Sequence, residues 1–268
     1  MNKQQHIKIM GVMNVTPDSF FDGGKYLDVN NAVSHGLAMQ AAGADIIDIG
    51  GESTRPGAAS VNAQDEINRV VPVIKALRDK SDVKISIDTS KAEVMKAAID
   101  AGADMINDVR ALLEPNALDT AVTLSVPVCL MHMQGQPGNM QNSPKYDNVV
   151  QDVFEFLQQR VEDCLSAGLK KENIIIDPGF GFGKTVNHNL LLLKHLSKLI
   201  TLNYPILIGL SRKSLLGKIL NKEVDNRLPG SLALATMGIL NGASIVRVHD
   251  VKETKQVVDV CNAYIDAN

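Results

Sequence analysis

The segment Asn173-Ile-Ile-Ile-Asp177-Pro-Gly-Phe-Gly-Phe-Gly-Lys184 indicates which fold the chain adopts. Its three consecutive isoleucines predict a strand with both faces buried, which is typical of parallel sheets covered by helices. The strand ends at the carboxylate of Asp177, and Pro178 has no amide proton with which to continue the ladder. An apolar strand that ends at a polar residue and leads into a turn is a pattern that recurs along the sequence.

This recurrence predicts eight strands, each followed by a helix. We expect the strands at residues 7–13, 45–49, 84–87, 105–106, 127–131, 174–176, 205–210 and 244–248. Connections from helix to strand are short and alike, whereas connections from strand to helix are long, polar and all different. One uniform face and one varied face are typical of a (β/α)₈ barrel. We therefore expect a single-domain TIM barrel over residues 1–268, in preference to a doubly wound open sheet.

Local signals place some of the helix ends. Asn30 is expected to cap the first helix. Ser90, with Glu93 three residues later, fits a capping box. A second helix is expected over residues 63–80, where Pro72 indicates a kink or a later start.

The composition is that of a globular protein and excludes several classes of function. Of 268 residues, 45% are apolar and 21% are charged, and the net charge of −3 offers no basic face for nucleic acid. No apolar run approaches the roughly 20 residues of a membrane helix, and the polar N-terminus is unlike a signal peptide. We therefore expect a cytoplasmic protein without a membrane partner. The three separated cysteines, Cys129, Cys164 and Cys261, predict neither disulfides nor a zinc site, and we expect them in the core.

Three polar residues end separate strands and are expected to point into one pocket. Asp88, Asn107 and Asp177 together provide two carboxylates and an amide, which suit the edge of a flat, nitrogen-rich heterocycle. Half-buried carboxylates need N–H donors or a cation. The alternative is that each aspartate caps the next helix and that Asn107 is only a turn residue.

A cationic set accompanies these acids. Arg247 and His249 lie two apart on the last strand, so their side chains lean to the same side. With Arg55, Lys213 and Asn14 they are suited to a diphosphate, because the guanidinium fork matches phosphate oxygens. The alternatives are an ion pair for Arg247 with a neighbouring strand, a core position for His249 and a solvated surface position for Lys213.

Aromatic residues are scarce, and four of the six phenylalanines lie in two strand-to-helix connections. Phe20 and Phe21 lie in the first, and Phe180 and Phe182 lie in the segment after Asp177. Such a placement suits a planar ligand or a closing lid. Packing of the two loops on each other is the alternative.

At these residues the sequence resembles dihydropteroate synthase. The resemblance extends over nearly the whole chain, in the order of the family's motifs. The matching segments are Gly11–Phe20, Gly50–Gly57, Ser86–Ser90, Ile106–Asp108, Asp177–Lys184, Ser211–Ser214 and Arg247–Asp250. The family often has a small residue where Phe21 stands and serine where Pro229 stands.

The resemblance implies an enzyme of folate biosynthesis. It would join 6-hydroxymethyl-7,8-dihydropterin diphosphate to 4-aminobenzoate with release of diphosphate, in the presence of Mg²⁺. It also implies a homodimer that sulfonamides inhibit. A pterin-binding methyltransferase with a corrinoid partner, a lyase using Lys213 as a Schiff base and a pterin-binding paralogue without activity are the alternatives.

The resemblance also implies roles for individual residues. The residues implied to contact the pterin are Asp88, Asn107, Asp177 and Lys213. Those implied to hold the diphosphate are Asn14, Thr54, Arg247 and His249, with the metal at Asn14. Those implied to contact 4-aminobenzoate are Arg55, Ser214 and Phe20. The catalytic residues implied are Asp88, Asp177, Lys213, Asp22 and Arg55. These residues fit a dissociative displacement, in which the two aspartates stabilise positive charge on the pterin.

Overall fold

The fold is a barrel of parallel strands, as a computed structural model shows for residues 6–15, 25–53, 60–135, 140 and 144–267. The strands in this part of the chain are β1 (Lys8–Asn14), β2 (Ile46–Gly50), β3 (Lys84–Asp88), β4 (Met105–Asp108), β5 (Val128–Met131), β6 (Ile174–Asp177), β7 (Leu207–Ile208) and β8 (Ile245–Val248). Their order is β6-β5-β4-β3-β2-β1-β8-β7. A parallel bridge between Ile176 and Ile206 brings the two ends of this order together, so the sheet closes. The predicted TIM barrel is confirmed.

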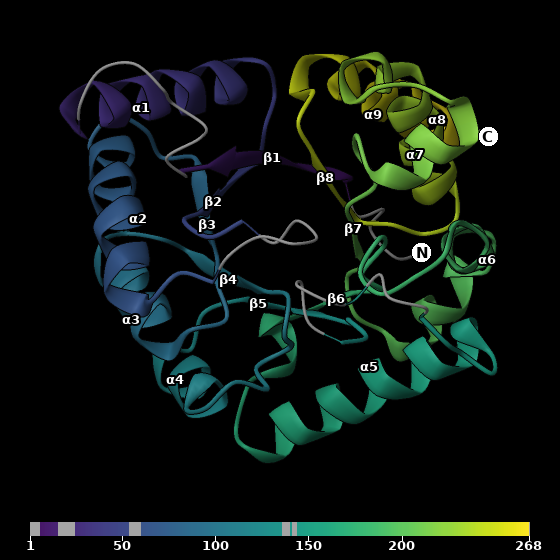
Figure 1. Cartoon of the computed structure of the whole chain (residues 1–268), viewed down its shortest axis with the longest axis horizontal. Helices are drawn as coiled ribbons and strands as arrows, with labels where there is room; N and C mark the ends of the chain where they lie inside the picture. Colours follow the sequence, from purple (N-terminus) through teal and green to yellow (C-terminus); the bar gives the residue numbers. More distant parts are fainter. Residues whose placement is uncertain (1–5, 16–24, 54–59, 136–139, 141–143, 268) are drawn as a thin grey trace.

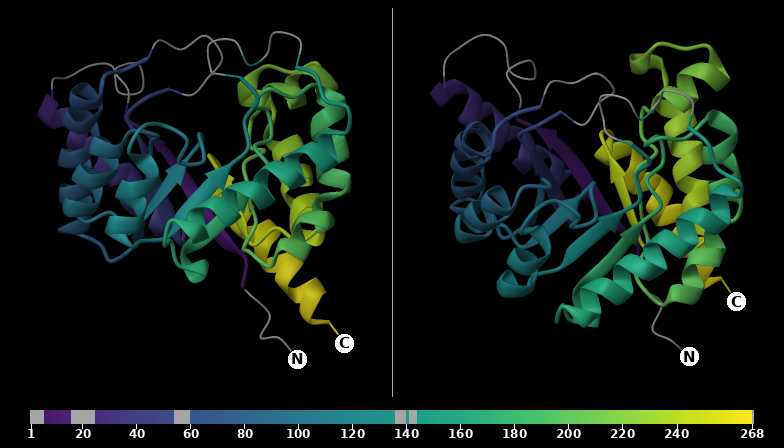
Figure 2. Two further views of the ribbon diagram at one scale, coloured as in Figure 1. Left: turned by 90° about the horizontal axis from the view of Figure 1, so that it is seen from below. Right: turned by 60° about the horizontal axis from the view of Figure 1, so that its bottom comes forward.

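Helices surround the strands on the outside (Figure 1). They are α1 (Lys25–Ala41), α2 (Ala63–Arg78), α3 (Ala92–Asp100), α4 (Ala117–Leu124), α5 (Val149–Ser166), α6 (Val186–Lys194), α7 (Ser214–Leu220), α8 (Leu228–Leu240) and α9 (Val251–Asp266). Figure 2 shows the last helix running away from the end of the barrel toward which the strands point. No helix in the described part of the chain is long and apolar enough to cross a membrane.

Two apolar clusters fill the molecule. The larger one lies between the outer faces of the strands and the helices and includes the outward-facing Ile47, Ile49, Ile85 and Ile87. The smaller one fills the inside of the barrel and consists of Met10, Ile46, Met105, Cys129, Ile175, Leu207 and Ile245. Because side chains alternate along a strand, the residues two positions later also face inward, nearer the carboxyl ends. All three cysteines are buried and free, as expected.

Two predicted helix caps were wrong. Helix α1 begins at Lys25, so Asn30 lies inside it; residues 25–29 include no glycine or proline that would stop a helix. Helix α3 follows Lys91 without a side-chain cap, because the Ser90 hydroxyl instead donates to the carboxylate of Asp108. Helix α2 begins at Ala63, as expected, and continues through Pro72, so the later start is excluded. Pro72 lies on the exposed face, which leaves the carbonyl that it frees within reach of water.

Candidate functional site

Polar residues at or near the carboxyl ends of β1, β3 and β4 lie in one row, with a glycine of β2 between the first two. The strand register places Asn14 opposite Gly50, Gly50 opposite Asp88, and Asp88 opposite Asn107. Asp88 and Asn107 are buried, and both lie within strands rather than in turns. The structure therefore brings together at one edge of the barrel three residues that are far apart in the sequence.

Arg247 reaches this row from β8. Its Nε lies 2.6 Å from Oδ2 of Asp48, and one terminal nitrogen lies 2.7 Å from Oδ2 of Asp88. Both distances are those of charge-assisted hydrogen bonds. The ion-pair alternative therefore describes Arg247, but the partners are on β2 and β3, across the inside of the barrel rather than on an adjacent strand.

Asp48 is the residue at this site that the sequence reasoning missed. It is fully buried, and besides Arg247 it accepts a hydrogen bond of 3.0 Å from the side-chain amide of Asn107. The signal was present in the sequence, because a lone carboxylate interrupts an otherwise apolar strand, Ile46–Gly50. Asp48 lies one inward-facing position before the end of β2, whereas the predicted residues are those expected to end the strands.

The two predicted aspartates do not act as helix caps. Helix α3 is preceded by Lys91 and helix α6 is capped by Thr185, so neither Asp88 nor Asp177 has that role. Asp177 is buried, and its Oδ1 accepts a hydrogen bond of 2.7 Å from the backbone amide of Gly179. The capping alternative is therefore wrong for both.

Lys213 lies over the segment that follows Asp177. Its ammonium donates to the carbonyl oxygen of Phe180 and lies 4.3 Å from the centre of the Phe182 ring, which is a cation–π contact. Lys213 is half-buried and is therefore not a freely solvated surface lysine. Phe180 is fully buried in the larger core, so the prediction of an exposed aromatic fails there.

His249 lies at the rim of the site, next to the end of β7. It is exposed, which excludes the core alternative, and its Nδ1 lies 3.0 Å from Oγ of Ser211. The next residues of the two loops are also in contact. Arg212 donates through two nitrogens to the carboxylate of Asp250, at 2.9 and 2.5 Å. The loops that carry Lys213 and His249 are therefore tied to each other.

Burial shifts the ionisation of these groups. Removal from water raises the pKa of Asp88 to about 7, although Arg247 lowers it and Asp48 raises it further. Burial also raises the pKa of Asp177, although the hydrogen bond from the amide of Gly179 and the positive charge of Lys213 lower it in part. The pKa of Lys213 falls to about 8, chiefly through burial. Burial disfavours the charge of Arg247, but Asp48 and Asp88 outweigh it and raise the pKa of Arg247.

Several buried oxygens in the described part of the chain have no hydrogen-bond partner. They include Oδ1 of Asp48, Oδ1 of Asp88 and Oγ of Ser86, all of which lie inside the barrel. A buried acceptor without a donor is unfavourable by roughly 1–3 kcal/mol. A ligand that brings N–H groups to this place would satisfy them.

Some predicted site residues lie outside the described part of the chain. They are Phe20, Phe21, Asp22, Thr54 and Arg55. Ser214 is described, and it is exposed at the first position of α7. Pro229 lies in the first turn of α8.

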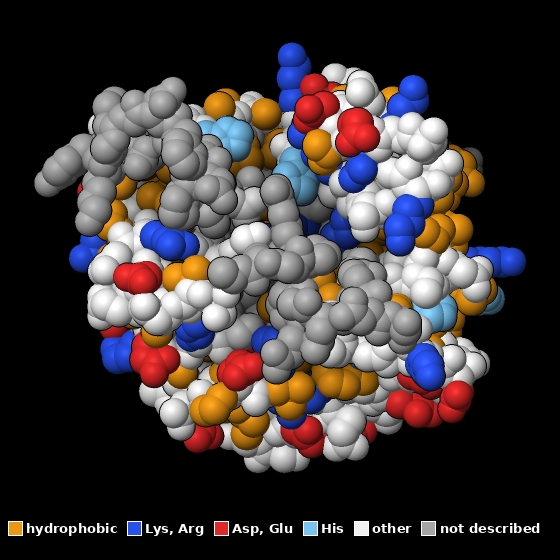
Figure 3. Space-filling view, viewed as in Figure 1, with side chains coloured by type: hydrophobic (Ala, Val, Ile, Leu, Met, Phe, Trp, Pro, Cys, Tyr) orange, Lys and Arg blue, Asp and Glu red, His pale blue; other side chains and the backbone are white. Residues whose placement is uncertain are grey.

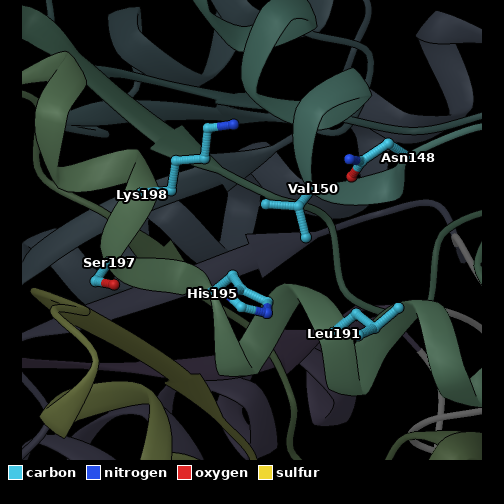
Figure 4. Close-up of a pocket in the computed structure, with 6 residues that line it drawn as sticks. All are labelled: Asn148, Val150, Leu191, His195, Ser197 and Lys198. Carbon is cyan, nitrogen blue, oxygen red and sulfur yellow. The ribbon is translucent and has the colours of Figure 1, made fainter.

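The surface has a hollow elsewhere. A cavity of about 460 Å³ lies on the outside of the barrel, where α5 approaches α6 and the 3₁₀ helix η3 (Leu196–Leu202). Figure 4 shows its lining residues, Asn148, Val150, Leu191, His195, Ser197 and Lys198. None of them belongs to the strand-end site. Acidic and basic side chains are interspersed on the face that Figure 3 shows.

The chain is similar to known proteins over almost its full length. Residues 10–249 match the family of pterin-binding enzymes. The dihydropteroate synthase of Haemophilus influenzae is 55% identical over 260 residues, which cover 97% of this chain and 94% of that protein.

Solved structures agree with the sequence relatives. The structure of Yersinia pestis dihydropteroate synthase with a sulfonamide drug has a TM-score of 0.93 and 51% identity, over 98% of this chain and 95% of that one. The Xanthomonas albilineans dihydropteroate synthase in complex with 7,8-dihydropteroate has a TM-score of 0.89 and 43% identity, over 98% and 95% of the two chains. Likeness of this extent covers all the strands that carry the site.

Proposed function

The chain belongs to the pterin-binding enzymes and, among them, to the dihydropteroate synthases, and from this premise we propose how its own residues carry the reaction. It condenses 6-hydroxymethyl-7,8-dihydropterin diphosphate with 4-aminobenzoate, giving 7,8-dihydropteroate and diphosphate in folate biosynthesis. The observation that carries the assignment of roles is the row of buried polar residues inside the barrel, with acceptor oxygens that lack a donor. The transfer is of an alkyl group to an aryl amine.

The pterin ring is bound by the acidic side of the site. Asp88, Asn107 and Asp177 present acceptors to the ring N–H groups, and the unpartnered Oδ1 of Asp88 supports this assignment. Lys213 covers the ring or donates to it from the opposite loop, where its half-buried ammonium is held. Asp48 is a supporting residue, because it holds both Arg247 and Asn107 in place.

The departing diphosphate is bound by the basic side. Arg247 lies on β8 and His249 directly follows the end of this strand, and Arg247 keeps its charge because two carboxylates flank it. Thr54 adds a hydroxyl. Asn14 shares the row with Asp88, so the acidic and basic halves meet there.

A divalent cation fits this junction as a partner of the substrate. Among the described residues, no three or more His, Cys, Asp or Glu side chains are grouped so that they could hold a metal ion. Mg²⁺ is commonly held by one or two protein oxygens together with substrate phosphates. The protein oxygen that would hold it is Oδ1 of Asn14, which shares the row with Asp88. Bound there, Mg²⁺ would neutralise charge that develops on the leaving group.

The displacement is dissociative. The carbon–oxygen bond to diphosphate breaks first, and its electron pair leaves with the diphosphate oxygen. The positive charge that spreads into the pterin is stabilised by the carboxylates of Asp88 and Asp177, which are already in place in a dry site. The amine lone pair of 4-aminobenzoate then forms the carbon–nitrogen bond, and the nitrogen loses a proton. An arylamine reacts in its neutral form, so a strong general base is not required.

The second substrate enters from the mouth. Arg55, Ser214 and Phe20 are proposed to contact 4-aminobenzoate, with Asp22 and Arg55 completing the catalytic set. The exposed position of Ser214 at the start of α7 supports this proposal, because its hydroxyl is accessible to a carboxylate. Because sulfonamides resemble 4-aminobenzoate, and a relative binds one, they are proposed to compete here. A cytoplasmic homodimer is the proposed form of the protein.

A diphosphate-release assay tests this function. Diphosphate should appear from the pterin substrate at a rate that 4-aminobenzoate increases, and 7,8-dihydropteroate should form in equal amount. Asp177→Asn keeps an acceptor for the Gly179 amide but removes the charge, so we expect kcat to fall more than about 100-fold. Asp119→Asn, on the exposed surface of α4, is the control. Normal turnover in D177N would remove Asp177 from the mechanism, and no release in the wild type would identify an inactive paralogue.

A further inference from the structure

Lys184, at the end of the glycine-rich segment, is a buried lysine that the reaction described above does not use. Its Nζ lies 2.9 Å from Nδ1 of His132. It also donates to three backbone carbonyls, at 2.8 Å from that of Gly179, 3.0 Å from that of Phe182 and 3.3 Å from that of His132. Burying an amine is unfavourable unless it is hydrogen-bonded, so this set of partners defines one position for the side chain.

These contacts join the glycine-rich segment to the end of β5. Gly179 has a φ of 68°, and a Cβ there would lie 1.9 Å from the carbonyl oxygen of His132. Gly183 has a φ of 63°, and its Cβ would lie 2.4 Å from the carbonyl oxygen of Gln134. Backbone therefore packs directly on backbone at both glycines. The ammonium of Lys184 lies at this seam and binds carbonyls from both sides of it.

The opposite side of the same segment holds the groups that face the site. The carbonyl of Phe180 accepts from Lys213, and the Phe182 ring lies 4.3 Å below its ammonium. The amide of Gly179 donates to Asp177. Movement of the segment would therefore displace an acid and a cation together.

We propose that Lys184 is a positioning residue for the pterin substrate: it clamps residues 179–182 onto β5 and so fixes Asp177 and Lys213. This inference rests on the proposed role of those two residues in pterin binding. Lys184 does not touch the substrate, because its nitrogen is enclosed by carbonyls and by the His132 ring. A residue that served only the stability of the barrel would change the thermal midpoint without a selective effect on one substrate.

Lys184→Met tests the proposal in the full-length enzyme, because methionine fills a similar volume without donors. We expect KM for the pterin diphosphate to rise about tenfold or more, while KM for 4-aminobenzoate at saturating pterin stays within about twofold. Lys96→Met, which removes a lysine from an exposed ion pair with Asp100, is the matched control and should leave both values unchanged. A folded K184M enzyme with unchanged KM for the pterin substrate would overturn the proposal.

His132→Phe provides a second test that does not depend on the folding of K184M. It removes the ring acceptor but keeps an aromatic ring against Phe156, whose centre lies 4.9 Å away. KM for the pterin substrate should rise by about two- to fivefold, less than in K184M because the carbonyl partners remain. If K184M does not fold, an unchanged value in H132F overturns the proposal.

Asp177→Asn separates this proposal from the proposed function. If D177N is impaired but K184M and H132F are normal, the function holds and the clamp does not. If D177N is also normal, the proposed role of Asp177 in pterin binding is wrong, and the proposal for Lys184 loses its basis.

Discussion

Replacement of Arg247 by methionine should destabilise the protein in a way that depends on pH. Methionine preserves much of the packing but leaves Asp48 and Asp88 without their shared cation inside the barrel. Removal of one partner of a buried ion pair costs about 3–5 kcal/mol. We expect a loss of that size in the free energy of unfolding at pH 8, measured by urea denaturation.

The loss should become smaller as the pH is lowered. In the wild type the pKa of Asp88 is already raised to about 7, so the folded state binds more protons than the unfolded state between roughly pH 4 and pH 7. Stability therefore decreases as the pH rises through this window. Without Arg247, the pKa of Asp88 rises further, so the range in which stability decreases with rising pH extends to higher pH. Each carboxyl that stays protonated changes the stability by up to about 1.4 kcal/mol per pH unit.

Arg212→Met is the matched control for this measurement. Arg212 also binds a carboxylate with two nitrogens, but its side chain is 34% exposed and the partner, Asp250, lies at the rim. We expect a loss near 1 kcal/mol that differs little between pH 6 and pH 8. An equal loss in R247M at both pH values would refute the reasoning, because it would mean that the carboxyl group of Asp88 does not take up a proton when the cation is removed.

Three other predictions concern the same site. Asp48→Asn leaves a buried N–H group facing a place without an acceptor and weakens the hold on Arg247, so kcat/KM for the pterin substrate should fall about tenfold with 4-aminobenzoate binding unchanged. Gly179→Ala would place a Cβ 1.9 Å from a backbone oxygen and should prevent folding or remove activity, whereas Gly168→Ala, where the nearest atom is 3.6 Å away but φ is 104°, should destabilise the fold by about 1–2 kcal/mol through backbone strain alone and leave activity intact. Removal of divalent cations by a chelator should abolish diphosphate release, and Mg²⁺ should restore it; Asn14→Ala should raise the Mg²⁺ concentration that is needed.

The order of strands and the face that holds the site were predictable from the sequence. Apolar runs indicate the buried strands. A polar residue at the end of such a run indicates a position outside the apolar core, where the strand reaches the site. Asp88, Asn107 and Asp177 were found by that rule alone. The ends of the helices were less predictable, because a local signal competes with tertiary partners: Ser90 has a good capping sequence, but Asp108 binds its hydroxyl.

The partners of Arg247 could not be predicted from strand neighbours. In an open sheet, a side chain on β8 reaches only the adjacent strands, but in a closed barrel the inward-facing side chains of all strands share one interior. The guanidinium of Arg247 therefore reaches through the interior of the barrel, past the adjacent strand β1, and binds carboxylates on β2 and β3. Sequence gives the direction of a side chain through the alternation along its strand, whereas the choice of partner depends on how the strands are staggered around the barrel.

The interior layers explain why this site can hold so many charges. Seven apolar residues, one from each strand except β3, fill the lower part of the barrel. Two positions later on four of these strands the inward-facing residue is polar, at Asp48, Asn107, Asp177 and Arg247. The apolar layer closes the barrel beneath them, so water can enter only from the mouth, and interactions between charges above it are strong. A pterin that covers the mouth would exclude the remaining water at the moment when positive charge develops between Asp88 and Asp177. In the proposed mechanism, the apolar layer would therefore contribute to catalysis through the low dielectric constant that it gives to the carboxylates above it.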